Sequence, residues 1–383
     1  MKIFKKTLLL LVVSISIVLS ESNIAIRIMA TANVHNETDP CGWKKKPLGG
    51  LARKATILDQ QSEGITNFYV VDAGNLFFKS NDIDPGITLE AAKINSEIIV
   101  ESFNTMGCDV FSPGEFDFSG GLDHLLKLEK EADFPFISCN IFDSSGNLMF
   151  DKYILDKNNG YNIAFIGLSS IFETEKITVG EPLEYLKETM TELDGISDIN
   201  ILLFHGNDID LKNLYTQGLD IDLIIKSGGN RKRSSDGGNK IPTFSLGDRG
   251  KIVYQFDLDI VDLDDELTDI SWCKNTIKRV SGRLEKMKKG DLMADLNELY
   301  KDNPATLRRI ENYENQIVKA NQKLENLVNS LAVEKIELGK SINDRIDILQ
   351  IVDKGKLKIQ KNLGPIPDDK GRMPDHPHHG HGH

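Results

Sequence analysis

The sequence predicts a layered α/β protein followed by a helical region of different composition. Between Ile24 and about Asn275, short apolar runs alternate with amphipathic segments of helical period, as in strands and helices stacked in layers. After Asn275, glycine and aromatic residues become scarce, and Lys, Glu, Asn and Leu predominate. The expected parts are a signal segment at 1–20, a layered domain at 21–275, a helical extension at 276–353 and a disordered tail at 354–383.

Most of the expected strands are continuous runs of Ile, Val, Leu and Phe, which is typical of strands covered on both sheet faces. They are Ile24–Met29, Phe68–Val71, Phe136–Cys139, Asn162–Gly167, Asn200–Phe204 and Leu223–Ile225. Helices are expected at Leu51–Gln60, Leu89–Met106, Leu122–Glu131, Pro182–Glu192 and Leu211–Gln217. An antiparallel pair is predicted to close the domain, at Lys251–Val261 and Leu267–Cys273.

The helical extension carries a heptad pattern. Asn303 and Pro304 predict a helix start, with Asn as the N-cap and Pro in the first turn. Apolar residues then recur at spacings of four and three, at Ile310, Tyr313, Ile317, Ala320, Leu324, Leu327 and Leu331. The pattern fits an antiparallel hairpin with the preceding helix or a coiled-coil homodimer, and its short length favours the hairpin.

The start of the chain has the pattern of an export signal. Lys2, Lys5 and Lys6 precede an apolar run at Leu8–Leu19 that is too short to span a bilayer comfortably. No later segment is apolar enough to cross a membrane. We therefore expect an exported protein, periplasmic or extracellular, without a membrane span after signal removal; an uncleaved anchor is the alternative.

The composition restricts the partners. The 383 residues carry a formal net charge of −12, with a pI near 5.2, which argues against nucleic acid or anionic lipid as the main partner. The four cysteines are too few for a disulfide scaffold. Cys108 and Cys139 are expected at opposite edges of the sheet, so they should not pair.

Five short blocks, each after an apolar run, carry the candidate site. In chain order they are Thr31-Ala32-Asn33-Val34-His35, Val71-Asp72-Ala73-Gly74-Asn75, Pro113-Gly114-Glu115-Phe116-Asp117-Phe118, Phe204-His205-Gly206 and Ser227-Gly228-Gly229-Asn230. In order and spacing they resemble the metal-binding blocks of the 5′-nucleotidase branch of the calcineurin-like metallophosphoesterases. The resemblance covers about Ile24 to Asp262. It implies a layered sandwich of two mixed sheets flanked by helices and, for an active member, hydrolysis of phosphoric esters.

Most of the family's metal ligands are replaced in these blocks. A dinuclear phosphoesterase centre holds two cations roughly 3.5–4 Å apart, and two dications that close require an anionic bridging ligand. The family's bridging Asp is matched here by Asn75, and the Asp of the first block by Asn33. Phe116 stands where the family has a His that donates to the phosphoryl or leaving-group oxygen. Gly228 and Asn230 occupy the positions of the last two His ligands.

The remaining candidate ligands are few. His35 and His205 match retained metal ligands, and Glu115 could ligate from the third block. Asn33 and Asn75 add weak carbonyl donors. This set could hold one divalent cation at most, Zn²⁺ or Mn²⁺. Alternatively, His205 only hydrogen-bonds to loop backbone and His35 only caps a turn.

Cys41 belongs to a further block. Asp39-Pro40-Cys41-Gly42-Trp43 leads into Pro47-Leu48-Gly49-Gly50-Leu51-Ala52-Arg53-Lys54. This resembles exported nucleotidase-like proteins that carry Cys-Gly-Cys before Gly-Gly-Leu-Ala-Arg-Arg. Some of these relatives have redox or haem-binding segments, which implies an exported redox protein as one candidate partner. Since Trp43 replaces the second Cys, Cys41 is a candidate extra metal ligand, a reactive thiol or an incidental cysteine.

The C-terminal residues form a His-rich tail. Neutral imidazoles at this density bind divalent transition metals. The tail ligands would be His376, His378, His379, His381 and His383. An expression tag is the alternative origin of this segment.

These observations favour an exported pseudoenzyme that serves as a binding or assembly module for a protein partner. Because the bridging carboxylate and the proton donor are both replaced, dinuclear hydrolysis is not expected. Two alternatives stay open at this stage. One is a divergent single-metal phosphoesterase, and the other is a periplasmic metal-handling protein that uses the tail.

Overall fold

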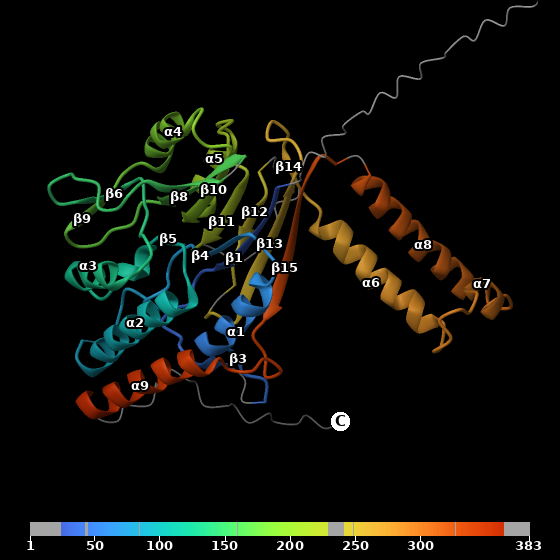
Figure 1. The fold of residues 1–383 in the computed structure, drawn as a ribbon, viewed down its shortest axis with the longest axis horizontal. Helices are drawn as coiled ribbons and strands as arrows, with labels where there is room; N and C mark the ends of the chain where they lie inside the picture. Colours follow the sequence, from blue (N-terminus) through green and yellow to red (C-terminus); the bar gives the residue numbers. More distant parts are fainter. Residues whose placement is uncertain are drawn as a thin grey trace, which may run out of the picture.

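Two β-sheets face each other, with helices on their outer faces (Figure 1). The computed structural model describes residues 24–42, 45–83, 85–158, 160–228, 241–247, 249–325 and 327–363. The expected signal segment and the His-rich tail lie outside the described residues. The layered α/β arrangement with two mixed sheets agrees with the predicted fold class.

The first sheet has the strand order β14-β15-β13-β1-β4-β5. Its strands are β1 (Ile24–Thr31), β4 (Asn67–Asp72), β5 (Val110–Phe111), β13 (Ile252–Ile260), β14 (Leu267–Asp269) and β15 (Asn329–Glu337). Strands β1, β4 and β5 are parallel, whereas β13 runs antiparallel to both β1 and β15. The parallel strands therefore all end at the same edge.

The second sheet has the strand order β12-β11-β10-β8-β7. Its strands are β7 (Tyr153–Asn158), β8 (Tyr161–Ser169), β10 (Ile199–His205), β11 (Leu223–Ser227) and β12 (Thr243–Ser245). All are parallel except β7. Buried side chains such as Ile28, Phe165, Leu203 and Phe256 fill the space between the two sheets.

Helices cover the outer face of each sheet. On the first sheet lie α1 (Leu51–Ser62), α2 (Ile87–Met106), α3 (Leu122–Glu131) and α9 (Ile346–Leu363). On the second lie α4 (Pro182–Leu193) and α5 (Asp208–Tyr215). Shorter elements are β2 (Pro40–Cys41), β3 (Leu48–Gly49), β6 (Ile141–Asp143), β9 (Ile177–Val179), the 3₁₀ turn η1 (Glu115–Phe118) and α7 (Leu296–Leu299).

A helical hairpin projects from the side of the layered body. It consists of α6 (Ser271–Met287) and α8 (Pro304–Leu324), which pack side by side (Figure 1). Asn303 caps α8 through its side chain, as predicted, by accepting from the Thr306 N–H at 3.0 Å. The favoured hairpin interpretation therefore agrees with the structure, while its alternative, a homodimer through this region, stays a hypothesis.

The predicted organisation of the C-terminal region was partly wrong. The heptad seam ends with α8 at Leu324, and Leu331 lies in β15, which returns to the first sheet between β14 and β13. The region 276–353 is thus no purely helical extension. Residues 354–363 were expected to be disordered, but they form the end of α9, which packs on α1 and α2.

Two predicted strands also differ. Phe136–Cys139 forms only isolated bridges, Phe111 with Phe136 and Ile137 with Asp151. The stretch 267–273 contributes only β14, which pairs in parallel with β15 instead of antiparallel with β13. Helix α6 begins at Ser271, because the chain must leave the sheet there to enter the hairpin.

Candidate functional site

A polar cavity lies where the parallel strands of both sheets end. Its volume is about 350 Å³. The carboxyl ends of parallel strands are where α/β folds place ligand sites, since the loops that follow converge there. The cavity is lined by residues at or just after the ends of β1, β4, β5, β8, β10, β11 and β12, namely Asn33, His35, Asn75, Glu115, Phe116, Ser170, Ile171, Phe172, His205, Gly206, Asn207, Gly228, Ser245 and Leu246.

The structure brings all five candidate ligands of the body to this cavity: Asn33, His35, Asn75, Glu115 and His205. It does not bring Cys41 there. Cys41 lies in β2, and burial raises the pKa of its thiol, which keeps it protonated near neutral pH. Asn230, Arg231 to Arg233 and the tail histidines lie outside the described residues.

The loops that carry the site are held in unusual backbone conformations. Asn33, His35 and Asn75 all have positive φ angles, of 54°, 57° and 56°. Asn and His are among the few non-glycine residues that tolerate this left-handed region. Gly114 allows the loops to approach each other, because a Cβ there would lie 2.6 Å from His205 Nδ1 and 2.8 Å from Asn75 Oδ1.

The two asparagines form an amide pair whose orientation is fixed by backbone donors. Phe116 N–H donates to Asn75 Oδ1 at 3.1 Å, and Gly228 N–H donates to Asn33 Oδ1 at 3.3 Å. A backbone N–H can only donate, so both amide oxygens must face these groups. Asn75 Nδ2 then donates to Asn33 Oδ1 at 3.2 Å. The two side chains are thus linked by a hydrogen bond and present no pair of oxygens to a cation.

The two histidines are held with the proton on Nδ1. His35 Nδ1 lies 3.3 Å from the Phe78 carbonyl oxygen, which can only accept. His205 Nδ1 lies 2.9 Å from Ser227 Oγ, and that hydroxyl donates its proton to the Ala73 carbonyl oxygen. A neutral ring held in this way carries its acceptor lone pair on Nε2. Burial, with Lys226 and His35 nearby, lowers the pKa of His205 to about 3, so this ring is neutral at physiological pH.

The remaining wall of the cavity is acidic at one point and aromatic elsewhere. Glu115 Oε1 accepts from Asn81 Nδ2 at 2.6 Å. The ring of Phe116 lies 5.9 Å from that of His35, and the ring of Phe172 lies 6.2 Å from that of His205. Phe116 cannot donate a proton to a leaving group, so this wall provides no general acid at the position where the family has one.

The residues at the cavity do not fit a dinuclear metal centre. Such a centre needs an anionic group between two cations, whereas Asn75 is neutral and its amide is used within the protein. Among the described residues, no group of three or more His, Cys, Asp and Glu side chains is placed to hold a metal ion. No catalytic step through a pair of metals can therefore be assigned to this cavity.

A buried carboxylate beneath the cavity holds its loops together. Asp117 Oδ2 accepts from the N–H groups of Asn75 and Gly114, both at 2.8 Å, and its Oδ1 accepts from Phe77 N–H at 2.8 Å. Burial raises the pKa of Asp117 to about 6, against the effect of these donors. Asp117 thereby positions the loops of Asn75 and Phe116. Asp117 lies in the third of the five sequence blocks, but its role was not predicted.

A second buried group supports the loop after β4. Lys54 Nζ donates to Thr31 Oγ1 at 2.9 Å, and Thr31 Oγ1 donates to Asp72 Oδ2 at 2.7 Å. Asp72 Oδ1 accepts from Gly74 N–H at 3.0 Å. Burial raises the pKa of Asp72 to about 7 and lowers that of Lys54, while their mutual attraction opposes both shifts. Asp72 lies in the second of the five blocks and Lys54 ends the segment that follows Cys41, but the sequence does not indicate that Thr31 links the two side chains.

Comparison with known proteins gives relatives of one kind. The chain is 28% identical over 218 residues to a 2′,3′-cyclic-nucleotide 2′-phosphodiesterase/3′-nucleotidase of Yersinia enterocolitica, a match that covers 50% of this chain and 33% of that protein. It is 33% identical over 141 residues to protein UshA of Escherichia coli, covering 36% of this chain and 24% of UshA. The matches thus span well under half the length of these curated relatives. No protein-family model matches the chain.

Solved structures agree on the fold. The 5′-nucleotidase precursor of Thermus thermophilus has a TM-score of 0.60 at 14% identity, covering 88% of this chain and 59% of that one. The calcineurin-like phosphoesterase YfkN of Bacillus subtilis has a TM-score of 0.58 at 14% identity, covering 90% of this chain and all of that one. The homologues and structural neighbours of this chain are therefore 5′-nucleotidase-like, calcineurin-like metallophosphoesterases.

The described part of the chain was also searched for membrane spans. None of its helices combines the length and the apolar character that crossing a bilayer requires.

Proposed function

We propose that this chain is an exported, non-hydrolytic member of the metallophosphoesterase fold that acts as a binding or assembly module. The observation that carries the proposal is the amide pair at Asn33 and Asn75. Both amide oxygens accept backbone N–H groups, and the two side chains hydrogen-bond to each other. This arrangement supports a cavity that binds through hydrogen bonds and apolar walls instead of through two cations.

Phosphatase assays test this proposal. Purified protein, supplied with Mn²⁺ or Zn²⁺, should hydrolyse nucleoside monophosphates and p-nitrophenyl phosphate no faster than a metal-only blank. The matched controls are His205→Ala in the cavity and His124→Ala, whose ring hydrogen-bonds to Ser96 outside it. Turnover that His205→Ala abolishes and His124→Ala retains would overturn the proposal.

The geometry of the two histidines supports a second candidate, a single-metal hydrolase. His35 and His205 both hold the proton on Nδ1, so Nε2 is the ring atom that each would use towards a metal, and Glu115 lines the same cavity. This candidate predicts metal-dependent turnover that falls to the blank in His35→Ala, in His205→Ala and in Glu115→Gln alike. Restoring the bridging group alone, as Asn75→Asp, should not create activity under the main proposal, because Phe116 still lacks a proton to donate.

A further inference from the structure

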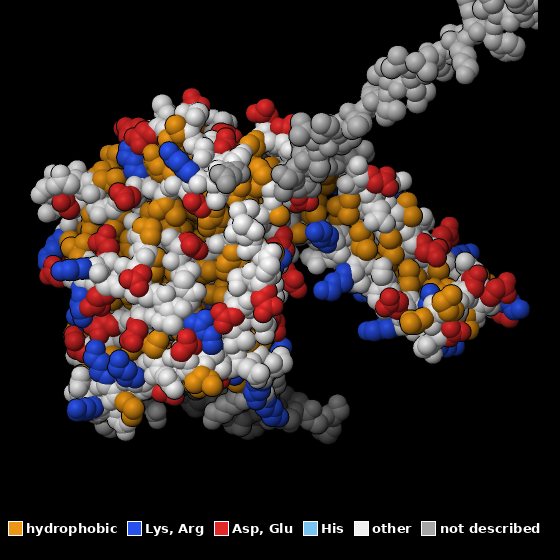
Figure 2. Space-filling model, in the orientation of Figure 1, with side chains coloured by type: hydrophobic (Ala, Val, Ile, Leu, Met, Phe, Trp, Pro, Cys, Tyr) orange, Lys and Arg blue, Asp and Glu red, His pale blue; other side chains and the backbone are white. Residues whose placement is uncertain are grey.

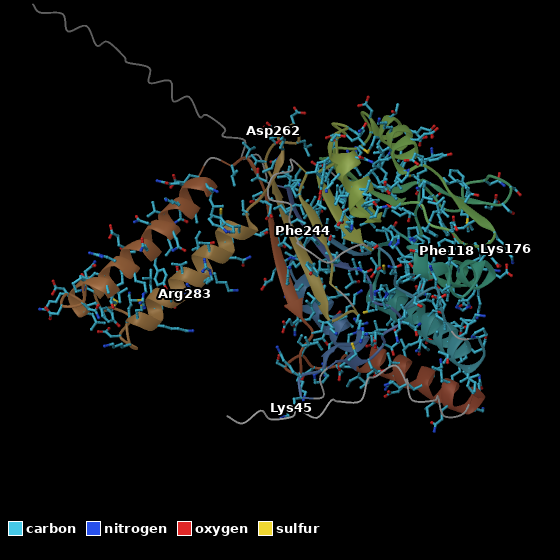
Figure 3. All side chains as sticks on the ribbon, turned by 180° about the vertical axis from the view of Figure 1, so that it is seen from behind. Lys45, Phe118, Lys176, Phe244, Asp262 and Arg283 are labelled. Atoms are coloured by element: carbon cyan, nitrogen blue, oxygen red, sulfur yellow. The ribbon has the colours of Figure 1, made fainter. Side chains whose placement is uncertain are left out.

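A second cleft, larger than the cavity at His205, separates the hairpin from the body. Its volume is about 680 Å³. One wall is the start of α6 and the other is β15, with Phe244 of β12 in the lining. Figure 3 shows Phe244 in the body beside the base of the hairpin and Arg283 farther out along it. The cleft is lined by Phe244, Asp257, Asp269, Ser271, Trp272, Lys274, Asn275, Lys278, Ala332, Val333, Glu334 and Lys335.

The edge of strand β15 opens into this cleft. Strand β14 pairs only with the first residues of β15, Asn329–Leu331. Beyond Leu331, no strand in the described part of the chain pairs with this edge. The Val333 N–H points towards this open edge and donates to Ser271 Oγ at 2.8 Å. In a strand, the backbone N–H of every second residue points in the same direction. Such an edge is a template for a strand from another chain.

The α6 wall of the cleft is basic. Lys274 and Lys278 are exposed on successive turns of α6, and neither forms an ion pair with a carboxylate of the described residues. Of the carboxylates that line the cleft, Asp257 pairs with Arg27 at 2.6 Å and Asp269 accepts from Ser271 N–H at 2.8 Å, whereas Glu334 is exposed on β15. The α6 wall of the cleft therefore carries two exposed positive charges, at Lys274 and Lys278, and the acidic Glu334 lies on the β15 wall.

The charge of the hairpin differs in sign from that of the whole protein. Residues 271–324 contain 12 Lys and Arg against 7 Asp and Glu, a formal charge of +5, so the rest of the chain carries −17 of the total of −12. Figure 2 shows basic side chains on the side of the hairpin that faces the body. Two hairpins would repel each other, which disfavours a second copy of the hairpin as the occupant.

An exposed tryptophan completes the cleft. The side chain of Trp272 is 59% exposed at the first turn of α6, and Lys323 Nζ lies 5.0 Å from its ring. Tryptophan is the residue type that most often anchors protein interfaces, because it buries a large area at low entropic cost. Here it stands next to the open edge of β15 and the two lysines.

We propose that this cleft binds an extended acidic segment of a partner protein, which adds as a strand to the edge of β15. The backbone of the segment pairs with β15, its carboxylates face Lys274 and Lys278, and its apolar side chains pack on Trp272. Residues of an extended strand alternate between its two faces, so a segment of alternating acidic and apolar residues fits best. This assignment rests on the proposed binding function and gives it a partner class.

The test uses the full chain and short fluorescein-labelled peptides, measured by fluorescence anisotropy. An alternating Glu/Val peptide should bind. A Lys/Val peptide of equal length should bind at least about tenfold more weakly, because its charges meet Lys274 and Lys278. The Glu/Val peptide with every second amide N-methylated should also lose about tenfold, because it cannot pair with a strand edge.

Protein variants locate the binding. Lys274→Glu combined with Lys278→Glu should weaken the Glu/Val peptide about tenfold. The matched control, Lys301→Glu combined with Lys319→Glu, reverses two exposed lysines of the same hairpin outside the cleft and should change binding less than about twofold. Circular dichroism verifies that both variants keep the fold. Trp272→Phe should weaken binding less than Trp272→Ala.

Several results would overturn the assignment. These are no binding of the Glu/Val peptide, equal binding of its N-methylated form, or equal loss in the control variant. If duplex DNA or phosphatidylglycerol vesicles bound more tightly than the Glu/Val peptide, the partner would be a nucleic acid or a membrane and not an acidic protein segment. A dimer in sedimentation that Lys274→Glu/Lys278→Glu dissociates would make a second copy the occupant. The phosphatase assays do not depend on any of these outcomes.

Discussion

The layer beneath the cavity and the wall of the cavity use the same loops but differ in charge. Beneath the cavity, the carboxylates of Asp72 and Asp117 point into the protein and accept backbone N–H groups. In the wall, Asn33 and Asn75 present neutral amides that bond to each other. The polar groups of both layers are hydrogen-bonded, but the two amides of the wall carry no negative charge that could bridge two cations.

This difference indicates that the residues that hold the loops in place are distinct from the residues that would bind a metal ion. The inward carboxylates accept hydrogen bonds from the backbone of the loops, so they stabilise these loops whether or not a metal is bound. The outward positions face a cavity, where an amide satisfies the loop backbone as well as a carboxylate would. The loops are therefore kept while two neutral amides, at Asn33 and Asn75, stand in the wall beside His35 and His205. The predictions below test this separation, from the largest effect to the smallest.

The scaffold should be far more sensitive to substitution than the wall. Asp117→Ala leaves buried N–H groups of Asn75, Phe77 and Gly114 without an acceptor, and each such loss costs about 1–3 kcal/mol. We expect the free energy of unfolding to fall by about 4 kcal/mol in urea titrations. Asp220→Ala, at an exposed carboxylate, is the control and should change stability little. A loss below about 1 kcal/mol for Asp117→Ala would remove the distinction between the layers.

Restoring a carboxylate in the wall should be unfavourable without metal. In Asn75→Asp, the atom that replaces Nδ2 faces Asn33 Oδ1 at 3.2 Å and can no longer donate to it. We expect a loss of roughly 3 kcal/mol in thermal or urea unfolding, from the lost hydrogen bond and the buried charge. Asn75→Ala serves as the control for loss of the side chain alone. An unchanged or raised stability of Asn75→Asp would show that the wall still accommodates charge.

The neutral state of His205 predicts a pH dependence of stability. Its pKa is lowered to about 3 in the fold, whereas the unfolded chain takes up a proton near pH 6.5. The stabilising contribution is therefore present above pH 6.5 and is lost as the pH falls towards 3. Between pH 6.5 and 5, wild type should lose about 2 kcal/mol more than His205→Gln in urea unfolding. Parallel pH profiles of the two proteins would contradict a neutral buried ring.

Substitutions at the rim of the cavity wall should reduce stability least. Asn81 Nδ2 donates to Glu115 Oε1 at 2.6 Å, but this contact is exposed. Asn81→Ala should cost less than about 0.5 kcal/mol, because water replaces the lost donor. Differential scanning calorimetry of Asn81→Ala beside Asn75→Ala measures the contrast. A larger loss at Asn81 would show that Glu115 needs its partner to remain in the wall.

The parts of the fold that follow from local pattern were predictable from the sequence. Helix α3 has the predicted bounds, Leu122–Glu131, and the strands that end at Thr31, Asp72 and His205 were expected within two residues. The return of the chain at β15 was not predicted. Leu331 fits the heptad spacing of α8, and only the distant pairing with β13 and β14 makes its segment a strand.

The candidate site shows the same limit. The order of the blocks was enough to predict that Asn33, Asn75 and His205 meet at one place. Their hydrogen-bonding roles were not predictable, since the donors that orient the two amides come from Phe116 and Gly228, in other loops. The sequence gives no sign of which backbone N–H faces which side chain.

Metal content tests the central account most directly. A chain that ends at Pro374 lacks the tail histidines, so any bound metal must lie in the body. It would be incubated with Zn²⁺ or Mn²⁺, desalted and analysed by inductively coupled plasma mass spectrometry beside its His205→Ala variant. We predict that both proteins retain the same background level of metal. Two ions per chain in the unsubstituted protein, lost on His205→Ala, would contradict the absence of a dinuclear centre.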